Sequence, residues 1–456
     1  MRRLRATAIA VLLVCLAVLG HGYATGPAHA AIETYETQAS LAPAERTPVV
    51  EPREDVTVVA GHGQDGRSAA LTAFGPDGTV VYRNDTHDGY FDVDPVDAGR
   101  ATVEYVAERS YDSPHCNAKC TQSLVERVNL TTGEVTRRYS RVVPQDRGAN
   151  WHDVDRLSDH ELLVGDIHRD GLYVVDTETG LKTWEWSAQT DFPLSGGGEY
   201  PADWSHLNDV ERLPDGRYMT SLRNQDLVAF VDPETGLQSN WTLGADGEYG
   251  VLYEQHNPDY VPEARGGPAV VVADSLNDRV IEYQREDGGE RTNGSRASSD
   301  SSDGAWEQSW VWSDEEMLWP RDADRLPNGN TLIADTNNHR VVEVDPDGEI
   351  VWEIETYSPY DVERLATGDE SAGGPAASAA ELTSREREEI GDDPLEVAGI
   401  TPRKAINSVS FVLPVWMGFG HAAAALVGAV TALAWLVAEL RASSVSVSLR
   451  WPVRFR

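Results

Sequence analysis

The chain of 456 residues has few basic side chains. Lysine and arginine together number 38, against 75 aspartates and glutamates, which gives a net charge of −37 at pH 7. The central part has no run of basic residues, which argues against nucleic acid as its partner. The acidic excess indicates a heavily solvated surface, typical of a salt-loving (halophilic) host, and is less typical of a patch made for one specific partner. An anion site must therefore be formed locally, by histidine and arginine.

Cysteine is also scarce, with only Cys15, Cys116 and Cys120 in the chain. Cys116 and Cys120 lie in one short polar loop, and we interpret them as a small disulfide of an exported protein. A metal pair with His115 is the alternative, but two thiols and one imidazole leave a zinc site incomplete. Four N-x-(S/T) sequons also fit export as glycosylation candidates: Asn84, Asn129, Asn240 and Asn293.

Long hydrophobic runs occur only near the two ends. Residues 1–30 carry an arginine cluster, an apolar run and a small-residue site at 28–30, which predicts a signal peptide or an uncleaved anchor. Residues 409–440 are apolar enough to predict a transmembrane helix, and the arginines that follow predict a cytoplasmic tail. An acidic Ala, Gly and Glu-rich tether is predicted over residues 367–404. We therefore expect a cell-membrane protein whose central domain is extracellular.

One short phrase recurs in the central part of the sequence. After one free position, the phrase has an aspartate, a valine or alanine, an aspartate or glutamate, and then Arg-Leu. It occurs at 151–157, 207–213, 320–326 and 359–365. Repeats at this spacing are typical of propellers and solenoids. Each phrase except the last is followed by short runs rich in Val, Ile, Tyr and Trp that are split by D-G, N-G and T-G turns, the pattern of strands and hairpins.

The repeats predict an all-β fold, a six-bladed β-propeller over residues 52–366 with four strands in each blade. The N-terminal strands at 56–83 lack the phrase, whereas the phrase at 360–365 lacks strands after it. We therefore predict that these two fragments make one blade. A C-terminal inner strand then closes the ring, and terminal hydrophobic helices complete the chain.

The free position of the phrase predicts a ring of side chains near one mouth of the channel. The residues in this position are Phe91, His152, Asn208, His256, Arg321 and Tyr360, and we expect His206 and Arg223 to lie near them. Scattered hydrogen-bonding residues at the blade rims are one interpretation of this set. Three imidazoles could also bind zinc, although the arginines nearby oppose a cation. Histidine together with arginine makes an oxyanion pocket, which is the interpretation that we favour.

These residues resemble the arylsulfate sulfotransferase family, the exported or membrane-associated six-bladed propellers. The resemblance rests on His152 in W-H-D-V, on His206-Leu-Asn208, on Arg223 and on the later His256. It implies that His256 is the catalytic nucleophile and that His152, His206, Asn208 and Arg223 bind sulfate; we add Arg321 to this set. It further implies transfer of a sulfuryl group from a phenolic sulfate ester to a phenol through a sulfohistidine, with neither a metal nor an organic cofactor. The departures from the family pattern are the cysteine loop and the smaller blades.

Two other functions remain open. The segment Asp335–Val342 is similar to interaction propellers of the NHL type, which favours a non-catalytic module that binds a ligand or a protein. The segment Asp176–Trp184 is similar to the tryptophan-docking blades of quinone-dependent dehydrogenases. Six units in place of eight argue against that second alternative.

Overall fold

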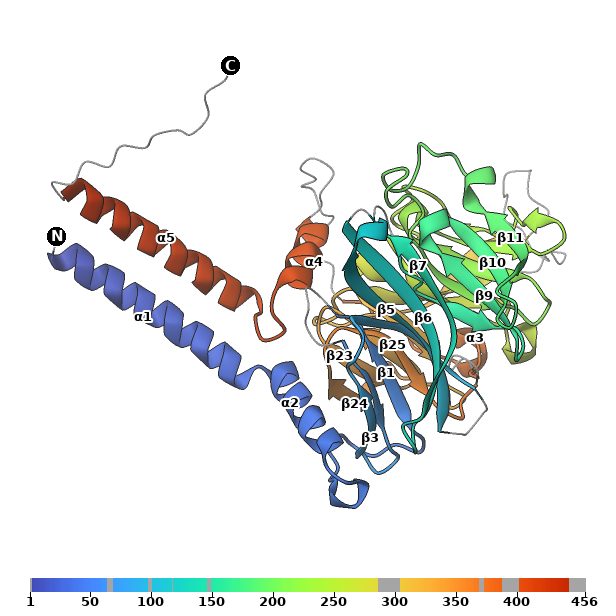
Figure 1. Ribbon diagram of the computed structural model, residues 1–456, viewed down its shortest axis with the longest axis horizontal. Helices are drawn as coiled ribbons and strands as arrows, with labels where there is room; N and C mark the ends of the chain where they lie inside the picture. Colours follow the sequence, from blue (N-terminus) through green and yellow to red (C-terminus); the bar gives the residue numbers. More distant parts are fainter. Residues whose placement is uncertain are drawn as a thin grey trace. The chain divides into compact units, whose positions relative to one another are not determined.

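The protein is described by a computed structural model that covers residues 2–63, 69–96, 101–116, 118–145, 149–285, 304–368, 373–387 and 402–442. Two compact units form, one from residues 31–411 and the other from the two ends of the chain. The larger unit contains all the strands of the described residues (Figure 1). It is a β-propeller of six antiparallel sheets, as predicted.

Each blade is one sheet, whose strands follow one another from the innermost outward. Blade 1 contains β25 (Pro359–Arg364), β1 (Thr57–Gly61), β2 (Leu71–Phe74) and β3 (Val80–Asn84). Blade 2 contains β4 (Gly89–Pro95), β5 (Thr102–Ser113), β6 (Ala118–Asn129) and β7 (Val135–Pro144). Blade 3 contains β8 (Val154–Arg156), β9 (Glu161–Asp166), β10 (Gly171–Asp176) and β11 (Lys182–Ser187).

The other three blades follow in chain order. Blade 4 contains β12 (Leu207–Arg212), β13 (Tyr218–Leu222), β14 (Leu227–Asp232), β15 (Gly236–Leu237) and β16 (Leu243–Gly244). Blade 5 contains β17 (His256–Val261), β18 (Ala269–Asp274), β19 (Arg279–Arg285) and β20 (Trp306–Trp312). Blade 6 contains β21 (Pro320–Arg325), β22 (Thr331–Asp335), β23 (Arg340–Val344) and β24 (Ile350–Glu355).

The ring closes as the sequence predicts. The last inner strand, β25, pairs with β1, so that Thr57 lies opposite Arg364 and Val59 opposite Val362. All six residues of β25 are buried. The two ends of the propeller therefore share one sheet, and blade 1 would lack its inner strand without the C-terminal phrase.

The aspartate that follows the free position joins neighbouring blades at several of the blade junctions. The Asp153 carboxylate accepts a hydrogen bond from the Val210 amide of the next blade at 2.6 Å, and the Asp361 carboxylate accepts one from the Val93 amide at 2.6 Å. Asp322 does the same for the Val362 amide at 3.1 Å. The repeated aspartate thus has a structural cause, because it satisfies a buried backbone donor across each of these blade junctions.

Blade 4 differs from the prediction of four continuous strands. Its outer edge is split into the two short strands β15 and β16, both of which pair with β14. The Trp241 ring between them lies 5.5 Å from the Phe230 ring and 6.0 Å from the Trp306 ring of blade 5. Packing of this indole across the blade junction holds the segment away from the ladder.

Part of the predicted tether packs on the propeller. Within residues 373–387, helix α3 (Ala377–Ala380) begins with a backbone amide that donates to the Glu282 carboxylate at 2.9 Å. The Trp310 indole donates to the Thr383 carbonyl at 3.1 Å, and Arg385 forms an isolated parallel bridge with Trp312. These residues are therefore a fixed part of blade 5, whereas residues 388–401 of the tether lie outside the described residues.

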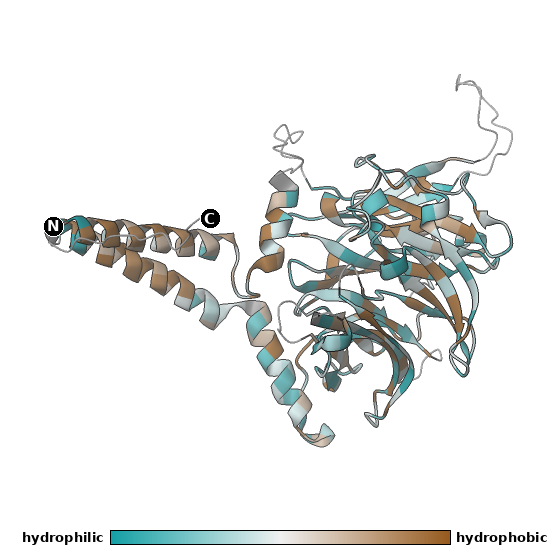
Figure 2. Cartoon of the chain, turned by 45° about the horizontal axis from the view of Figure 1, so that its top comes forward, coloured by the Kyte–Doolittle hydropathy of each residue, from teal (hydrophilic) through white to brown (hydrophobic). Residues whose placement is uncertain are grey.

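The terminal segments are helical. Helices α1 (Arg2–Thr25) and α5 (Phe419–Ala442) belong to the smaller unit and are both long and apolar enough to cross a membrane (Figure 2). Within this unit they pack together, and Arg5 pairs with Glu439 at 2.6 Å. Most of α2 (Pro27–Ser40) and nearly all of α4 (Pro402–Val412) belong to the propeller unit.

Candidate functional site

Irregular backbone at the inner strands aims the free-position side chains. In β12, Leu207 pairs with Leu222 and Asp209 with Ser221, so that Asn208 between them has no partner in the ladder. The register skips Arg321 and Tyr360 in the same way. A bulge of this kind redirects the side chain of the extra residue. Strand pairing therefore does not constrain the side chains of Asn208, Arg321 and Tyr360. His256 differs, because it pairs with Ala273 and the skip in the register follows it, at Asn257 and Pro258.

A second irregularity lies two residues before the free position. His206, Glu254, Trp319 and Ser358 all have left-handed backbone, with φ of 43°, 46°, 54° and 44°. Such φ values are uncommon outside glycine and cluster at functional sites. The same conformation in four blades turns the chain sharply into each inner strand at this mouth of the channel.

Tyr360 lies at the centre of the predicted residues. Its hydroxyl lies 2.8 Å from Nδ1 of His152. Its ring centroid lies 5.9 Å from the His256 ring and 4.8 Å from Cζ of Arg321. His206 joins the group, with its ring 5.1 Å from that of His152. The structure thus brings together three predicted histidines and one predicted arginine from blades 3 to 6.

His256 is held in one tautomer. Its Nδ1 lies 3.1 Å from the Glu254 carbonyl and 2.8 Å from the Ser275 hydroxyl. The carbonyl can only accept, and the hydroxyl donates its hydrogen to the Pro320 carbonyl at 2.6 Å. Nδ1 must therefore carry the proton. Nε2 keeps a lone pair and is buried without a hydrogen-bond partner in the described part of the chain.

The surroundings keep His256 neutral. Burial, followed by the charge of Arg321, lowers its pKa well below the usual value of 6.5. The pKa of His152 is lowered in the same direction by burial and then by His206. A neutral imidazole with a free nitrogen is a nucleophile near neutral pH, whereas an imidazolium is not.

His206 is positioned by a carboxylate. Its Nδ1 lies 2.8 Å from both carboxylate oxygens of Asp203. Burial and then Arg223 lower the pKa of His206, and the hydrogen bond with Asp203 opposes them. A carboxylate on one imidazole nitrogen fixes the ring and makes the other nitrogen more basic. The sequence did not identify Asp203, although it lies only three residues before His206.

Arg321 is a buried cation without a counter-ion in the described structure. It is 6% exposed, and its Nε and Nη1 atoms have no hydrogen-bond partner there. Burial lowers its pKa to about 10, so that it stays charged at neutral pH. A buried guanidinium normally binds an anion or a carboxylate. Its free nitrogens therefore suit the oxygens of a sulfate group.

Arg223 and Asn208 flank this cluster less directly. The Arg223 guanidinium lies 3.6 Å from the Glu254 carboxylate and donates to the Asn224 side chain at 3.0 Å. The Asn208 amide donates to the Gln255 carbonyl at 3.1 Å. Both side chains already have protein partners, in contrast to Arg321.

His62 is a further member that the sequence did not indicate. It follows β1, and its ring centroid lies 5.0 Å from Phe91 and 6.1 Å from Tyr360. Burial and then Arg321 lower its pKa to about 3. Its unit lacks the repeated phrase, so no alignment of the repeats could find it.

A belt of carboxyl groups lies along the inner strands beside the cluster. It surrounds a cavity of about 20 Å³, and its aspartates are Asp92, Asp153, Asp209, Asp259, Asp322, Asp324 and Asp361. Burial raises the pKa of each one, to about 6 for Asp153 and about 7 for Asp322. A raised pKa favours the neutral carboxyl over the carboxylate, which limits the negative charge that faces the candidate anion site.

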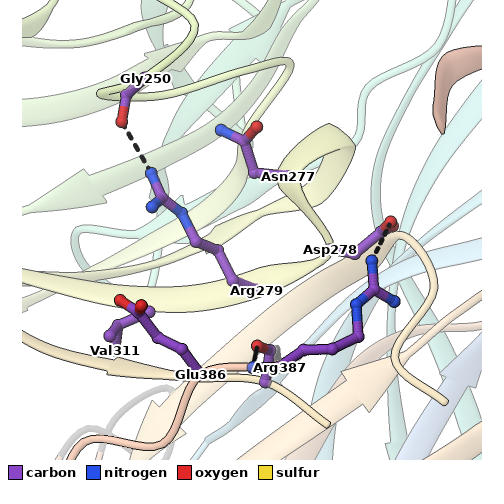
Figure 3. Close-up of a pocket in the computed structure, with 8 residues that line it drawn as sticks. Gly250, Asn277, Asp278, Arg279, Val311, Glu386 and Arg387 are labelled. Carbon is purple, nitrogen blue, oxygen red and sulfur yellow. Dashed lines mark hydrogen bonds and ion pairs between the residues drawn. The ribbon is translucent and has the colours of Figure 1, made fainter. Parts of the chain in front are cut away.

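Two larger cavities lie outside this cluster. One of about 310 Å³ is lined by Asp203, Asn224 and Glu254, which contact His206 and Arg223, and by Lys404 of α4. The other, of about 260 Å³, lies over blade 5 between Arg279 and Arg387 and contains none of the predicted site residues (Figure 3).

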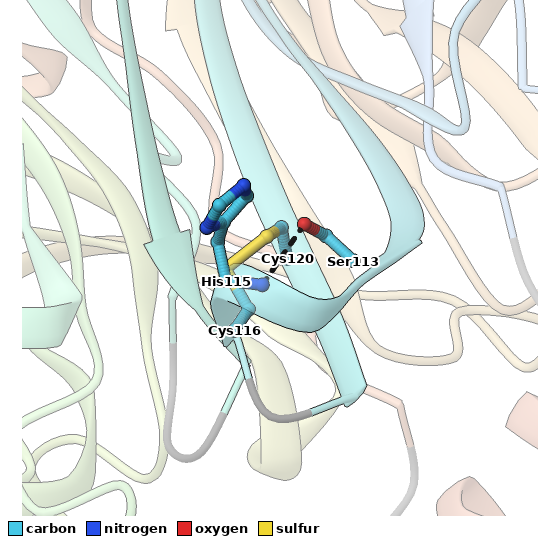
Figure 4. Close-up of a disulfide and its surroundings, with 4 residues drawn as sticks. All are labelled: Ser113, His115, Cys116 and Cys120. Carbon is cyan, nitrogen blue, oxygen red and sulfur yellow. Dashed lines mark hydrogen bonds between the residues drawn. A yellow bond between two sulfur atoms is a disulfide. The ribbon is translucent and has the colours of Figure 1, made fainter.

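The remaining predicted positions lie away from this cluster. Cys116 and Cys120 are joined by a disulfide at the end of the β5–β6 hairpin (Figure 4). The Asn84 and Asn129 side chains accept hydrogen bonds from nearby threonines, and Asn240 is exposed. Asn293 lies outside the described residues.

Residues 165–357 match the model of the arylsulfotransferase (ASST) family. This match and the propeller fold support that family. The matched range contains His206, Asn208, Arg223, His256 and Arg321, and it ends before Tyr360. No curated protein sequence matches the chain.

Several solved propellers are similar in outline. A Bacteroides caccae protein of unknown function matches with a TM-score of 0.45 and 11% identity over 69% of this chain and 99% of its own. A Pseudomonas aeruginosa periplasmic gluconolactonase matches with a TM-score of 0.43 and 15% identity over the same shares. A Staphylococcus aureus virginiamycin B lyase matches with a TM-score of 0.38 and 6% identity over 69% of this chain and 88% of its own.

Proposed function

We propose that the protein transfers a sulfuryl group from an aryl sulfate ester to a phenol, with His256 as the nucleophile. The observation that carries the proposal is the fixed tautomer of His256, which leaves a buried, neutral Nε2. A buried cation without a counter-ion in the described structure, Arg321, lies against the same tyrosine ring. A nucleophile beside an anion-binding group is the arrangement that attack on an anionic ester needs.

In the first half-reaction Nε2 of His256 attacks sulfur. The N–S bond forms, the S–O bond to the aryl group breaks, and the phenolate leaves. The imidazole ring gains positive charge, which the Glu254 carbonyl stabilises through Nδ1–H. In the second half-reaction the oxygen of the acceptor phenol attacks sulfur, the N–S bond breaks, and neutral His256 returns. The phenol proton is released, and it balances the proton that the first phenolate takes up.

The other residues hold the transferred group. We assign Arg321, His152 and His206 to the sulfuryl oxygens because Arg321 and His152 contact Tyr360, as His256 does, and because His206 lies beside His152. Arg223 and Asn208 flank the site. Since Glu254 already partners Arg223, this arginine must exchange or share that carboxylate to reach sulfate. Charge builds on the oxygens in the transition state, so fixed cationic donors lower the barrier.

Intact-mass analysis after incubation with nitrophenyl sulfate tests the proposal. The wild-type chain should gain one sulfuryl group with donor alone and lose it when a phenol is added, in the high salt that an acidic chain needs. His256→Ala should gain none. An adduct that persists in this variant would move the nucleophile to His152 or His206. Neither adduct nor transfer over several aryl donors would favour a binding propeller.

We also propose that the propeller is extracellular and that α1 is retained as a second membrane helix. The support is the packing of α1 against α5 and the Arg5–Glu439 pair at their ends. Cysteine introduced at exposed Asp347 should react with a membrane-impermeant maleimide on intact cells, whereas cysteine at position 454 should react only after lysis. The reverse pattern would invert the topology. N-terminal sequencing that begins near residue 31 would show that α1 is cleaved.

A further inference from the structure

One face of helix α4 packs against the propeller. Lys404 pairs with Glu254 at 2.7 Å, the Asn407 amide donates to Asp278 at 3.0 Å, and the Phe411 ring stacks on Trp319 with centroids 6.3 Å apart. These three positions are spaced by three and four residues, which places them on one side of a helix. Ile406 and Val409 lie on the exposed side. The helix is thus docked through specific side chains.

The docking points lie beside the candidate site. Glu254 and Trp319 are two of the residues with left-handed backbone, two positions before His256 and Arg321. The Glu254 carbonyl holds Nδ1 of His256, while its carboxylate partners Lys404 and Arg223. Helix α4 therefore crosses the rim from blade 5 to blade 6, directly next to the nucleophile and the free arginine.

Phe411 reaches Arg321 itself. Cζ of Arg321 lies 5.8 Å from the Phe411 ring and 5.9 Å from the Trp319 ring. Both rings are partly exposed, whereas the Phe91 and Tyr360 rings deeper in the channel are buried. The rim thus offers two partly exposed aromatic faces beside a buried guanidinium whose Nε and Nη1 have no partner in the described structure.

We propose that Phe411 and Trp319 form the subsite for the aryl group of the sulfate ester. The inference rests on the proposed function. An aryl sulfate is an anion joined to an apolar ring through one oxygen, so a site for it needs a cation and an aromatic wall close together. Arg321 supplies the cation, and the two rings supply the wall. Trp319 lies within the matched residues 165–357, whereas α4 lies outside them, so the C-terminal part of the chain contributes the Phe411 wall of the subsite.

The subsite predicts selectivity between donors. An aryl ring that contacts Phe411 and Trp319 gains stacking and apolar contact, whereas an alkyl sulfate or inorganic sulfate uses only the cationic part. Removal of the Phe411 ring should therefore weaken the binding of aromatic esters alone. A structural role of Phe411 in holding α4 would instead weaken all anions together.

The test compares 2-naphthyl sulfate with inorganic sulfate by calorimetry on the His256→Ala background, where the proposed mechanism gives no adduct. Phe411→Ala should weaken naphthyl sulfate binding roughly tenfold and leave inorganic sulfate unchanged. Phe411→Trp should restore naphthyl sulfate binding. Ile406→Ala, on the exposed face of the same helix, is the control and should change neither affinity.

Two outcomes overturn the aryl subsite: unchanged naphthyl sulfate binding in Phe411→Ala, or equal loss for both anions. Failure of the proposed function is seen separately, because it is the absence of a sulfuryl adduct in the otherwise wild-type chain. A naphthyl-specific loss in Phe411→Ala without any adduct would leave the aryl subsite standing in a protein that binds aryl sulfates but does not transfer them.

Discussion

The Ser275 hydroxyl lies 2.8 Å from Nδ1 of His256 and gives its own hydrogen to the Pro320 carbonyl. One serine thus joins two blades and sets the tautomer of the candidate nucleophile. The equivalent turn of blade 6 has Thr336, which donates to the Pro359 carbonyl at 2.7 Å but holds no histidine. Blades 5 and 6 thus share the hydroxyl bond to the next blade, and of these two blades only blade 5 adds the bond with histidine.

Ser275→Ala should slow the formation of the sulfuryl adduct roughly tenfold, the effect typical of a group that orients a reactive side chain. The Glu254 carbonyl still accepts from Nδ1, so the reaction should not stop. Single-turnover intact-mass kinetics with nitrophenyl sulfate measure this rate. Thr336→Val removes the matching bond in blade 6 and should leave the rate within about twofold. Equal slowing in both variants would show that Ser275 acts only through blade packing.

Arg321→Met should remove the cation and keep most of the side-chain volume. Loss of one oxyanion donor costs roughly 10²–10³ in rate, and we expect this drop in adduct formation together with loss of inorganic sulfate binding. Arg212→Met, an exposed arginine on β12, removes the same charge and should change neither quantity. Unchanged sulfate binding in Arg321→Met would place the anion elsewhere, with Arg223 the next candidate.

The rate of adduct formation should begin to fall only at a pH below the ordinary pKa of histidine. Burial and Arg321 lower the pKa of His256, so its neutral form persists as the pH falls through 6.5. A histidine with an unshifted pKa would lose about nine-tenths of its neutral form by pH 5.5. We expect single-turnover rates at pH 5.5 and 7.5 to agree within about twofold.

The same profile has an internal check. Arg321→Met removes one cause of the shift, so the acid limb of its slower reaction should move to higher pH. An acid limb centred near pH 6.5 in the wild-type chain would mean that His256 is not a neutral, buried nucleophile.

The sequence predicted the blade count, the closure and most of the cluster. It could do so because the repeated aspartate has one physical task, the bond to a backbone amide of the next blade, as between Asp153 and Val210. This constant spacing within the chain placed His152 and Arg321 in register, whereas His256, which is followed by Asn257, was placed by matching Val261-Pro262 to Leu213-Pro214. At Asn208, Arg321 and Tyr360 a bulge removes the free position from the ladder, so that strand pairing does not restrict the side chain there.

Features without a repeat signal could not be predicted. His62 belongs to the one unit that lacks the phrase, and Asp203 acts through a turn whose shape the sequence does not show. The docking of α4 depends on tertiary contacts such as that of Phe411 with Trp319. An Ala, Gly and Glu-rich composition likewise predicted a tether where residues 373–387 pack on blade 5.

The carboxyl belt predicts that stability falls as the pH rises. Burial raises the pKa of Asp322 to about 7, whereas an unfolded aspartate titrates near 3.8. Between these values the folded state binds more protons than the unfolded state, so the stabilisation is complete below the lower pKa and is lost as the pH rises through the upper one. Ionisation of Asp322 at pH 8 therefore lowers the stability of the folded protein.

Asp322→Asn should remove that destabilisation, because the amide oxygen can still accept from the Val362 amide without becoming charged. Relative to wild type, we expect the variant to gain on the order of 2 kcal/mol more at pH 8 than at pH 5, because the cost of ionisation grows between the two pKa values. Thermal unfolding at the two pH values measures the difference. Asp347→Asn removes the same charge at an exposed position and controls for the general acidity of the chain. It should change the stability at pH 5 and at pH 8 by the same amount. A loss of stability for Asp322→Asn that is equal at pH 5 and pH 8 would show that the carboxyl group does not titrate in this range.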